Sequence, residues 1–477
     1  MGRVEDQDGQ QNLWIAHAEL ASAPGHPFYE KLNELLKGER FDDFVEGLCE
    51  RYYAAKFGRP SLLPGIHFRS LLIGYFEGIE AERGMAWRLA DSLALRSFLG
   101  IALTERTPDH STISRTRRLI DLETHRQVFS WVLKLLADRG LIQGKRIGID
   151  ATTLGANAAR RTIVRRDTGE SYNEFLTGLA KASGIETPTR EDLARLDRKR
   201  EKRTSNKEWV STVDADARIA KMKDGSTRMA YKAEHAVDMD SGAVIAVTLQ
   251  AADLGDTTTV RQPLPEAGMA VAAVVAHQAE ERPNDAPKVN VDGVEEFVAD
   301  KGYHSAAVVL WVEECEVGSY IPERKQTGVR NWEGKEAERQ AVLANQERIE
   351  DEYGKELLRK RGELVERSFA HCYETGAMRR CTLRGNKNIL KRLLIQVGAF
   401  NLSLILRKTL GAGTPRELKN RGAELVLRLF RLLTSLYRPS RAAEPRSARV
   451  IATEGNNRSK RPRCRTVWDL HTCTTGC

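Results

Sequence analysis

The stretch that decides the fold is Lys145-Arg146-Ile147-Gly148-Ile149-Asp150. It is short, rich in β-branched isoleucine and preceded by Gly144, which predicts a buried strand rather than a helix. An unpaired carboxylate beside a core is costly, and open α/β sheets place their chemistry at the carboxyl ends of strands. Asp150 is therefore either a turn residue that closes the strand or part of a functional site.

The same pattern occurs a second time. Glu296-Phe297-Val298-Ala299-Asp300 is again a short strand that ends in Asp, and Lys301-Gly302-Tyr303 follows it. A third acid, Glu366, lies in a basic stretch of helical character. The repetition favours a functional site over two unrelated turns.

The composition suggests a soluble chain with a polyanionic partner. The 477 residues contain 75 Lys and Arg against 66 Asp and Glu, a net charge of +9, and the basic residues are clustered. Clustered basic residues favour binding of a polyanion, although a solvated surface has the same composition. The seven cysteines form no C-x-x-C pair. We see neither a signal peptide nor an apolar run of about 20 residues, so we expect a reducing cytoplasm and no membrane.

The N-terminal part is predicted to be helical. Residues 1–25 form a loose arm, and residues 26–140 form a helical domain with a helix over 83–98 and another over 121–139. Between these two, Asp109 or Ser111 could cap a helix. That helix would present Ser114, Arg115, Arg117 and Arg118. A turn followed by such a helix is how helix-turn-helix modules contact DNA, but an ordinary bundle with a charged face fits the same pattern.

Residues 141–410 are predicted to form the catalytic domain. After the first strand, the turns Asp224-Gly225 and Asp240-Ser241-Gly242 indicate two antiparallel hairpins. A helix and a further strand are expected within 253–278, then the strand 295–299, a helix over 306–315 and a short strand at 319–321. Charged insertions with helices interrupt this order at 156–210 and 326–362.

The C-terminal part is predicted to contain one helix and a tail. Thr414-Pro415-Arg416-Glu417 has the form of a capping box and starts a helix within 411–439. Residues 440–477 are basic and aperiodic and are predicted to be disordered.

This order of elements predicts an α/β fold with a ribonuclease-H-like mixed sheet, preceded by an all-α domain of helix-turn-helix type. In such a sheet the ends of the first and fourth strands lie side by side, so Asp150 and Asp300 would converge, and Glu366 could join them from a later helix. Converging carboxylates repel one another and need cations, and hard oxygen ligands select Mg²⁺ or Mn²⁺. Two such ions can activate a nucleophile and stabilise the leaving oxygen of a phosphodiester.

The chain also resembles a known family. The resemblance rests on His110-Ser111-Thr112-Ile113-Ser114-Arg115, Gly148-Ile149-Asp150-Ala151-Thr152, Val298-Ala299-Asp300-Lys301-Gly302-Tyr303 and Glu363-Leu364-Val365-Glu366-Arg367-Ser368-Phe369. These stretches resemble those of the DDE transposases of bacterial insertion sequences, in the branch with a long helical N-terminal domain.

The resemblance implies a nuclease and strand transferase with Asp150, Asp300 and Glu366 as catalytic residues and metal ligands. Its substrates would be double-stranded DNA, namely the terminal inverted repeats and a target, and two ends held together imply at least a homodimer. Glu363 is close enough to Glu366 to be confused with it. Asp238 and Asp240 are interpreted as strand-end and turn residues.

Several further residues are candidates for contact with DNA. Arg367 could neutralise the scissile phosphate, because a guanidinium matches phosphate geometry. Lys301, Tyr303, Asn388 and Lys391 could also touch DNA, although a surface charge or a core tyrosine would look the same. Two other functions stay open, a repurposed transposase that only binds DNA and a ribonuclease-H-like nuclease without strand transfer.

Overall fold

The computed structural model describes residues 25–53, 61–200, 204–222, 224–324 and 330–422. The predicted N-terminal arm, most of the C-terminal helix and the basic tail lie almost wholly outside these residues. Within them, the chain up to Gly422 forms one compact unit.

The N-terminal helices follow the predicted periodicity. They are α1 (Pro27–Gly38), α2 (Phe41–Cys49), the short η2 (Glu50–Tyr52), α3 (Pro64–Glu77), α4 (Glu82–Asp91), α5 (Leu93–Leu99), α6 (His110–Leu119) and α7 (Leu122–Asp138). The single helix expected over 83–98 is two helices, because the Ser92 side chain accepts a hydrogen bond from the Leu95 N–H and caps α5. Asp109 caps α6 as predicted, accepting the N–H groups of Ser111 and Thr112.

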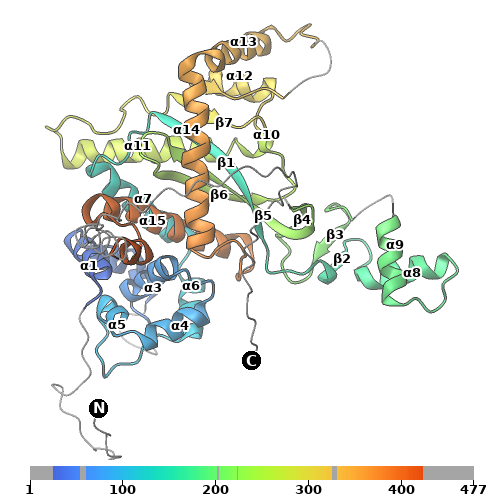
Figure 1. The fold of residues 1–477 in the computed structure, drawn as a ribbon, viewed down its shortest axis with the longest axis horizontal. Coiled ribbons are helices and arrows are strands. Elements are labelled where there is room, and N and C mark those ends of the chain that lie inside the picture. The colour runs from blue at the N-terminus through green and yellow to red at the C-terminus, as the bar shows by residue number, and fades with distance from the viewer. Residues whose placement is uncertain (1–24, 54–60, 201–203, 223, 325–329, 423–477) are drawn as a thin grey trace, which may run out of the picture. The chain divides into compact units, whose positions relative to one another are not determined.

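A mixed six-stranded sheet forms the core of the part of the chain that was predicted to be catalytic (Figure 1). Its strands are β1 (Arg146–Gly155), β4 (Arg218–Lys221), β5 (Thr227–Asp238), β6 (Val244–Ala251), β7 (Glu296–Ala299) and β8 (Gly318–Tyr320). β5 pairs antiparallel with β1, β4 and β6, whereas β7 pairs parallel with β1 and β8. Antiparallel strands that follow β1, and β7 parallel beside β1, agree with the predicted ribonuclease-H-like sheet.

Helices cover both faces of this sheet. The long helix α14 (Glu352–Phe369) contacts β1, β5 and β7, while α11 (Pro263–Glu281) contacts β1, β5 and β6. The strand expected within 253–278 is wrong, because this segment is the short helix α10 (Asp256–Thr259) followed by α11. Pro263 at the first turn and the buried stripe Ala267, Val271 and Val274 suit a helix rather than a strand.

The two predicted insertions are helical. The first contains η3 (Arg160–Thr162), α8 (Tyr172–Ala182) and α9 (Arg190–Lys199), together with an unpredicted two-stranded sheet of β2 (Ile163–Arg165) and β3 (Trp209–Ser211). The second contains α13 (Glu336–Glu350), which follows α12 (Ala306–Glu314). α14 then runs without a break through position 362, where this insertion was expected to end.

The helix α15 (Asn386–Leu410) joins the N-terminal helices to the sheet. It follows the π-helical turn η4 (Ala370–Thr375) and packs against α3, α7 and β6. The Asn401 amide accepts the N–H of Val244 and donates to its carbonyl, which satisfies the backbone of β6. Among the described residues one stretch, 386–422, is long and apolar enough to cross a membrane, but 89% of its most apolar window is buried, as in a core helix.

Candidate active site

Asp150 and Asp300 are brought together by strand pairing. The register of the parallel pair β1 and β7 sets Ile149 beside Ala299, so the next residue on each strand is one of the two aspartates. Both side chains are half-buried, which leaves them open to solvent at the carboxyl edge of the sheet. This is the adjacency that the sequence predicted for these two residues.

The surroundings of Asp150 shift its pKa in opposite directions. Burial raises the pKa of Asp150 above its ordinary value, and the nearby Asp300 carboxylate raises it further. The guanidinium of Arg361 on α14 opposes both effects, with Nη1 lying 3.0 Å from Asp150 Oδ2. The other oxygen, Oδ1, accepts the Ala151 N–H at 2.7 Å. One cation and one backbone donor therefore partly offset the rise in the Asp150 pKa that burial causes.

Asp300 is held by the loop that follows β7. The Gly302 N–H donates to Asp300 Oδ1, and a Cβ on Gly302 would clash with Asp256 Oδ2 and come within 3.2 Å of Asp300 Oδ1. A side chain at position 302 would have to displace the Asp256 carboxylate, which pairs with Lys232. The glycine of the Asp-Lys-Gly-Tyr stretch is thus explained by close packing rather than by a left-handed backbone.

A buried polar network lies next to this loop. Glu234 on β5 has no exposed surface and accepts hydrogen bonds from Thr259 at 2.6 Å, Gln250 at 2.6 Å and Tyr303 at 2.9 Å. Lys232, two residues earlier on β5, pairs with Asp256 at 2.5 Å. The network ties β5 and α10 to the loop that carries Asp300. The sequence could have indicated this network, because Lys232 and Glu234 lie within an apolar strand and charged residues are rarely buried without partners.

Glu366 is not brought into a metal-binding group with the two aspartates. In the parts of the chain that the structure describes, no three Asp, Glu, His or Cys side chains are arranged to hold a metal ion. The residues of α14 that face β1 are Arg361 and Val365, and Glu366 is exposed. Because each residue turns an α-helix by about 100°, Glu366 lies on the flank of α14 next to the face that contains Val365.

The same geometry places Glu366 away from the contacts that α14 makes with the sheet. Leu358 of α14 packs against a buried cluster of Val298, Tyr320 and Leu357. Glu366 follows Leu358 by eight residues, which turns its side chain about 80° away from that of Leu358 around the helix axis. Glu363 is also exposed and forms an ion pair with Arg367, so the guanidinium expected to meet a phosphate is paired within its own helix. Glu366 makes no ion pair with a described residue.

Asp150 and Asp300 suit a divalent cation. They offer hard oxygen donors on adjacent strands, and their mutual repulsion favours a bound positive charge. Asp238 has a different role, because it is buried and accepts the N–H groups of Gln143, Gly144 and Asp240. Asp240 pairs with Arg146. Both therefore act in the strand-end structure, as the sequence indicated.

His235 is a neighbour of Asp150 that the sequence did not single out. It lies opposite Asp150 in the β1–β5 pair, fully buried, with its ring nitrogens bonded to the hydroxyls of Ser368 and Tyr373. Burial lowers the pKa of His235 to about 3, so the ring is neutral. It fixes α14 and the following π-helical turn over β5.

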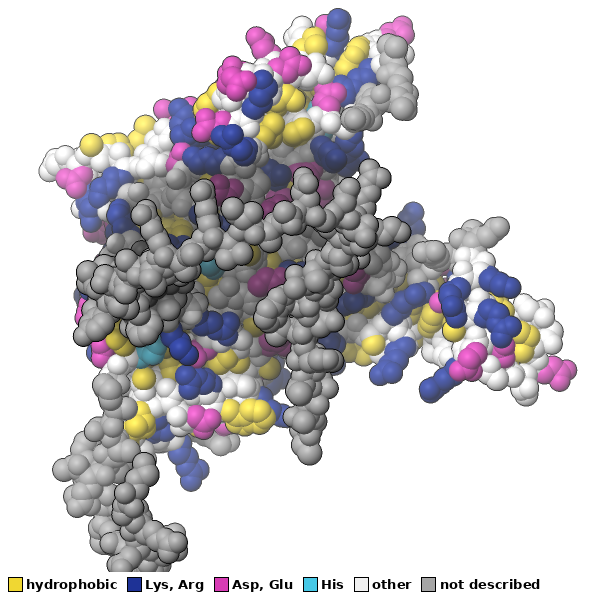
Figure 2. Space-filling model, in the orientation of Figure 1, with side chains coloured by type: hydrophobic (Ala, Val, Ile, Leu, Met, Phe, Trp, Pro, Cys, Tyr) yellow, Lys and Arg dark blue, Asp and Glu magenta, His cyan; other side chains and the backbone are white. Residues whose placement is uncertain are grey.

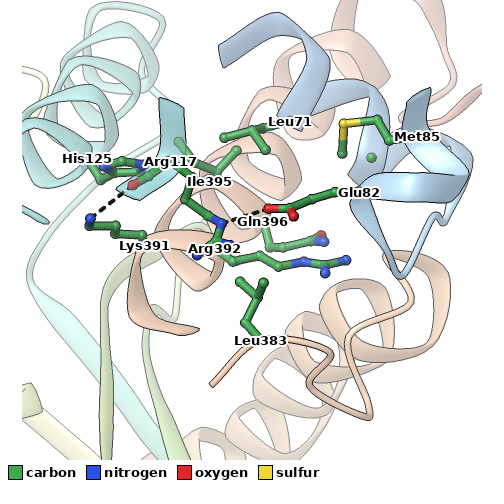
Figure 3. A pocket seen from close by; sticks show the side chains of 11 residues that line it. Leu71, Glu82, Met85, Arg117, His125, Leu383, Lys391, Arg392, Ile395 and Gln396 are labelled. Carbon is green, nitrogen blue, oxygen red and sulfur yellow. Dashed lines mark hydrogen bonds and ion pairs between the residues drawn. The ribbon is translucent and has the colours of Figure 1, made fainter. Parts of the chain in front are cut away.

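Three side chains predicted to bind DNA are buried instead. Tyr303 has no exposed surface and donates to Glu234, Arg117 pairs with Glu82 at 2.7 Å, and Lys391 donates to the carbonyls of Arg117 and Ile120. Arg117 and Lys391 line a cavity of about 20 Å³ between the N-terminal helices and α15 (Figure 3). A cavity of that size has room for about one water molecule. Arg117 and Lys391 join α6 to α4 and α15, and Tyr303 ties the Asp300 loop to β5, so none of the three side chains is exposed to a DNA surface.

The other predicted DNA contacts are accessible. Arg115, Arg118 and Lys301 are exposed, and Ser114 and Asn388 are half-buried. On the face drawn in Figure 2, Lys and Arg side chains alternate with Asp and Glu over the regions of α13 and of α8 and α9. The visible basic residues on this face therefore do not form one continuous patch.

Comparison with solved structures gives only a weak match. The Mos1 transposase paired-end complex with left transposon end matches with 12% sequence identity over 68% of this chain and 82% of that chain. Its TM-score of 0.16 is too low to support a shared fold. No curated protein matches the chain.

Two family models match separate parts of the chain. Residues 17–119, which include the N-terminal helices through α6, match a transposase domain (DUF772). Residues 300–406, which begin at Asp300 and include Glu366, match a transposase DDE domain. The order of the two matches agrees with the resemblance seen in the sequence, and the two transposase domains together indicate a DDE transposase.

Proposed function

We propose that this transposase binds the terminal inverted repeats of a mobile element, cleaves phosphodiester bonds there and joins the freed ends to target DNA. The observation that supports it most is the pairing of Asp150 and Asp300 at the carboxyl ends of parallel strands, beneath the helix that contains Glu366. The match of residues 300–406 to a transposase DDE domain supports the same reading.

Asp150 and Asp300 would hold the divalent ions in this proposal, with Glu366 as the third ligand. Bound Mg²⁺ or Mn²⁺ would lower the pKa of an attacking water or hydroxyl and stabilise the leaving oxygen, with two ions sharing these tasks. Glu366 is exposed on α14 and would reach the aspartates through a change of rotamer together with a rotation of the helix. The neutral His235 and the Glu234 network would keep β5, α14 and the Asp300 loop in place.

The N-terminal helices would supply part of the DNA contact. The exposed Arg115 and Arg118 on α6 lie outside the buried face of that helix, and Lys301 is exposed beside Asp300. Arg367 would exchange its ion pair with Glu363 for a phosphate when DNA binds. Because two ends must be held together, we propose a homodimer or larger assembly on DNA, acting in the bacterial cytoplasm at the nucleoid.

The test is a reaction with labelled DNA that ends in the element's inverted repeat, together with a target plasmid. With Mg²⁺ we expect nicked or cut ends and joined products, and with EDTA neither. Cleavage without joining in any metal would favour a plain nuclease. Specific end binding without cleavage would favour a repurposed DNA-binding protein.

A further inference from the structure

Helix α14 lies unusually close to β1 at Gly148. A Cβ on Gly148 would lie 3.2 Å from Arg361 Cγ, 3.4 Å from Val365 Cγ2 and 2.5 Å from Met239 Sδ. The aliphatic part of Arg361 therefore lies against the strand at a position where a larger residue would have to displace Met239 and press on Arg361. This packing directs the guanidinium along β1 toward Asp150, two residues further on.

The Arg361 guanidinium is fixed by one carboxylate. Nη1 lies 3.0 Å from Asp150 Oδ2, and the Arg361 side chain is only 14% exposed. Its Nε is buried and has no hydrogen-bond partner among the described residues. A buried donor without a partner is unfavourable, so Asp150 is the interaction that accounts for the position of the charged group.

We propose that Arg361 is the resident counter-ion of Asp150 and must leave that carboxylate before a divalent cation can bind. Of the two Asp150 oxygens, Oδ1 accepts the Ala151 N–H and Oδ2 faces Arg361. A cation at Oδ2 would meet the guanidinium at close range, and like charges repel. Arg361 therefore neutralises the charge of the Asp150 carboxylate in the metal-free site and weakens premature metal binding. This inference rests on the proposed metal site.

Release of Arg361 would also make a phosphate-binding group available. A guanidinium that leaves a carboxylate can form paired hydrogen bonds with two phosphate oxygens. DNA and metal would then favour the same change, because DNA offers Arg361 a new anion while the metal takes its place on Asp150. Metal affinity and DNA binding are coupled through this one side chain.

The experiment measures Mn²⁺ binding to the full-length protein without DNA, by electron paramagnetic resonance of free Mn²⁺, in wild type, Arg361→Gln and Arg359→Gln. Arg359 is exposed on the same helix and makes no described ion pair, so its variant controls for the loss of one positive charge. We expect Arg361→Gln to bind Mn²⁺ at least tenfold more tightly than wild type, and Arg359→Gln to change the affinity by less than about twofold.

Thermal melting of the same proteins provides a second readout. In EDTA, Arg361→Gln should melt below wild type because Asp150 loses its partner, and saturating Mn²⁺ should remove most of that difference. A lower melting temperature with unchanged Mn²⁺ affinity would overturn the proposal and leave a purely structural ion pair. Equal tightening in both variants would also overturn it. Absence of Mn²⁺ binding in all three proteins would overturn the metal site itself and this proposal with it.

Discussion

Replacing Tyr303 by Phe separates a structural role of this tyrosine from contact with DNA. The hydroxyl donates to Glu234 Oε1 at 2.9 Å, and both residues have no exposed surface. A hydrogen bond to a charged group contributes about 1.5–3 kcal/mol. Glu234 keeps its bonds from Thr259 and Gln250 after the change, so its charge is not left alone. We expect a loss of about 1.5–3 kcal/mol in the free energy of unfolding.

The assay is urea unfolding followed by circular dichroism, with the free energy extrapolated at constant slope. Tyr353→Phe is the matched control, because its hydroxyl also donates to a glutamate, Glu296, at 2.7 Å but at the surface, with Tyr353 39% exposed. That variant should lose less than about 1 kcal/mol. A Tyr303→Phe protein as stable as the control, with weakened affinity for a DNA duplex, would refute the structural role.

Three further predictions concern stability and DNA binding. Burial lowers the pKa of His67 to about 3 and that of His125 to about 4, so the unfolded chain binds more protons below its ordinary histidine pKa of about 6.5. As the pH is lowered from about 6 to 4.5, these two groups should therefore reduce the free energy of unfolding by up to about 2.7 kcal/mol per pH unit. A midpoint of urea unfolding that does not change over that range would contradict this prediction. Lys391→Met should lower the free energy of unfolding by about 1–3 kcal/mol because two buried carbonyls lose their donor, while the affinity for DNA stays unchanged. A loss of DNA affinity without a loss of stability would contradict this prediction. Replacing Arg115 and Arg118 by Ala should weaken duplex binding and reduce the slope of log affinity against log salt by about 1–2, measured by fluorescence anisotropy. An unchanged slope would show that these two residues do not contact phosphates.

The pairing of Asp150 and Asp300 was predictable because it depends on topology. Two short strands that each end in Asp, separated by antiparallel hairpins, leave few arrangements of a mixed sheet, and the parallel pair of β1 and β7 follows from them. The place of Glu366 was not predictable to the same degree. The packing of Val365 and Arg361 against Gly148 sets the rotation of α14 about its axis. The helical period alone does not predict that rotation.

Polar residues that are buried by distant partners account for the remaining errors. Tyr303, Arg117 and Lys391 have residue types that suit DNA contact, but Glu234, Glu82 and the carbonyls at the end of α6 bury them. Those partners come from distant parts of the chain. The role of Arg361 was not predictable for the same reason, because a charged residue on a helix is expected to be solvated unless the strand on which it packs is known.

The central claim is that Asp150, Asp300 and Glu366 act together on a divalent ion during DNA cleavage. The most direct measurement is the single-turnover rate of cleavage of a pre-bound element end, started with Mg²⁺, for Asp150→Asn, Asp300→Asn and Glu366→Gln, with Glu363→Gln as the matched control. Each of the three should cut roughly 10³-fold more slowly or worse, since loss of a ligand removes several kcal/mol of transition-state stabilisation. End binding should be retained, and the control should cut at the wild-type rate. Wild-type cleavage by Asp150→Asn or Asp300→Asn would contradict the account, and loss in Glu363→Gln with activity in Glu366→Gln would show the third ligand misassigned.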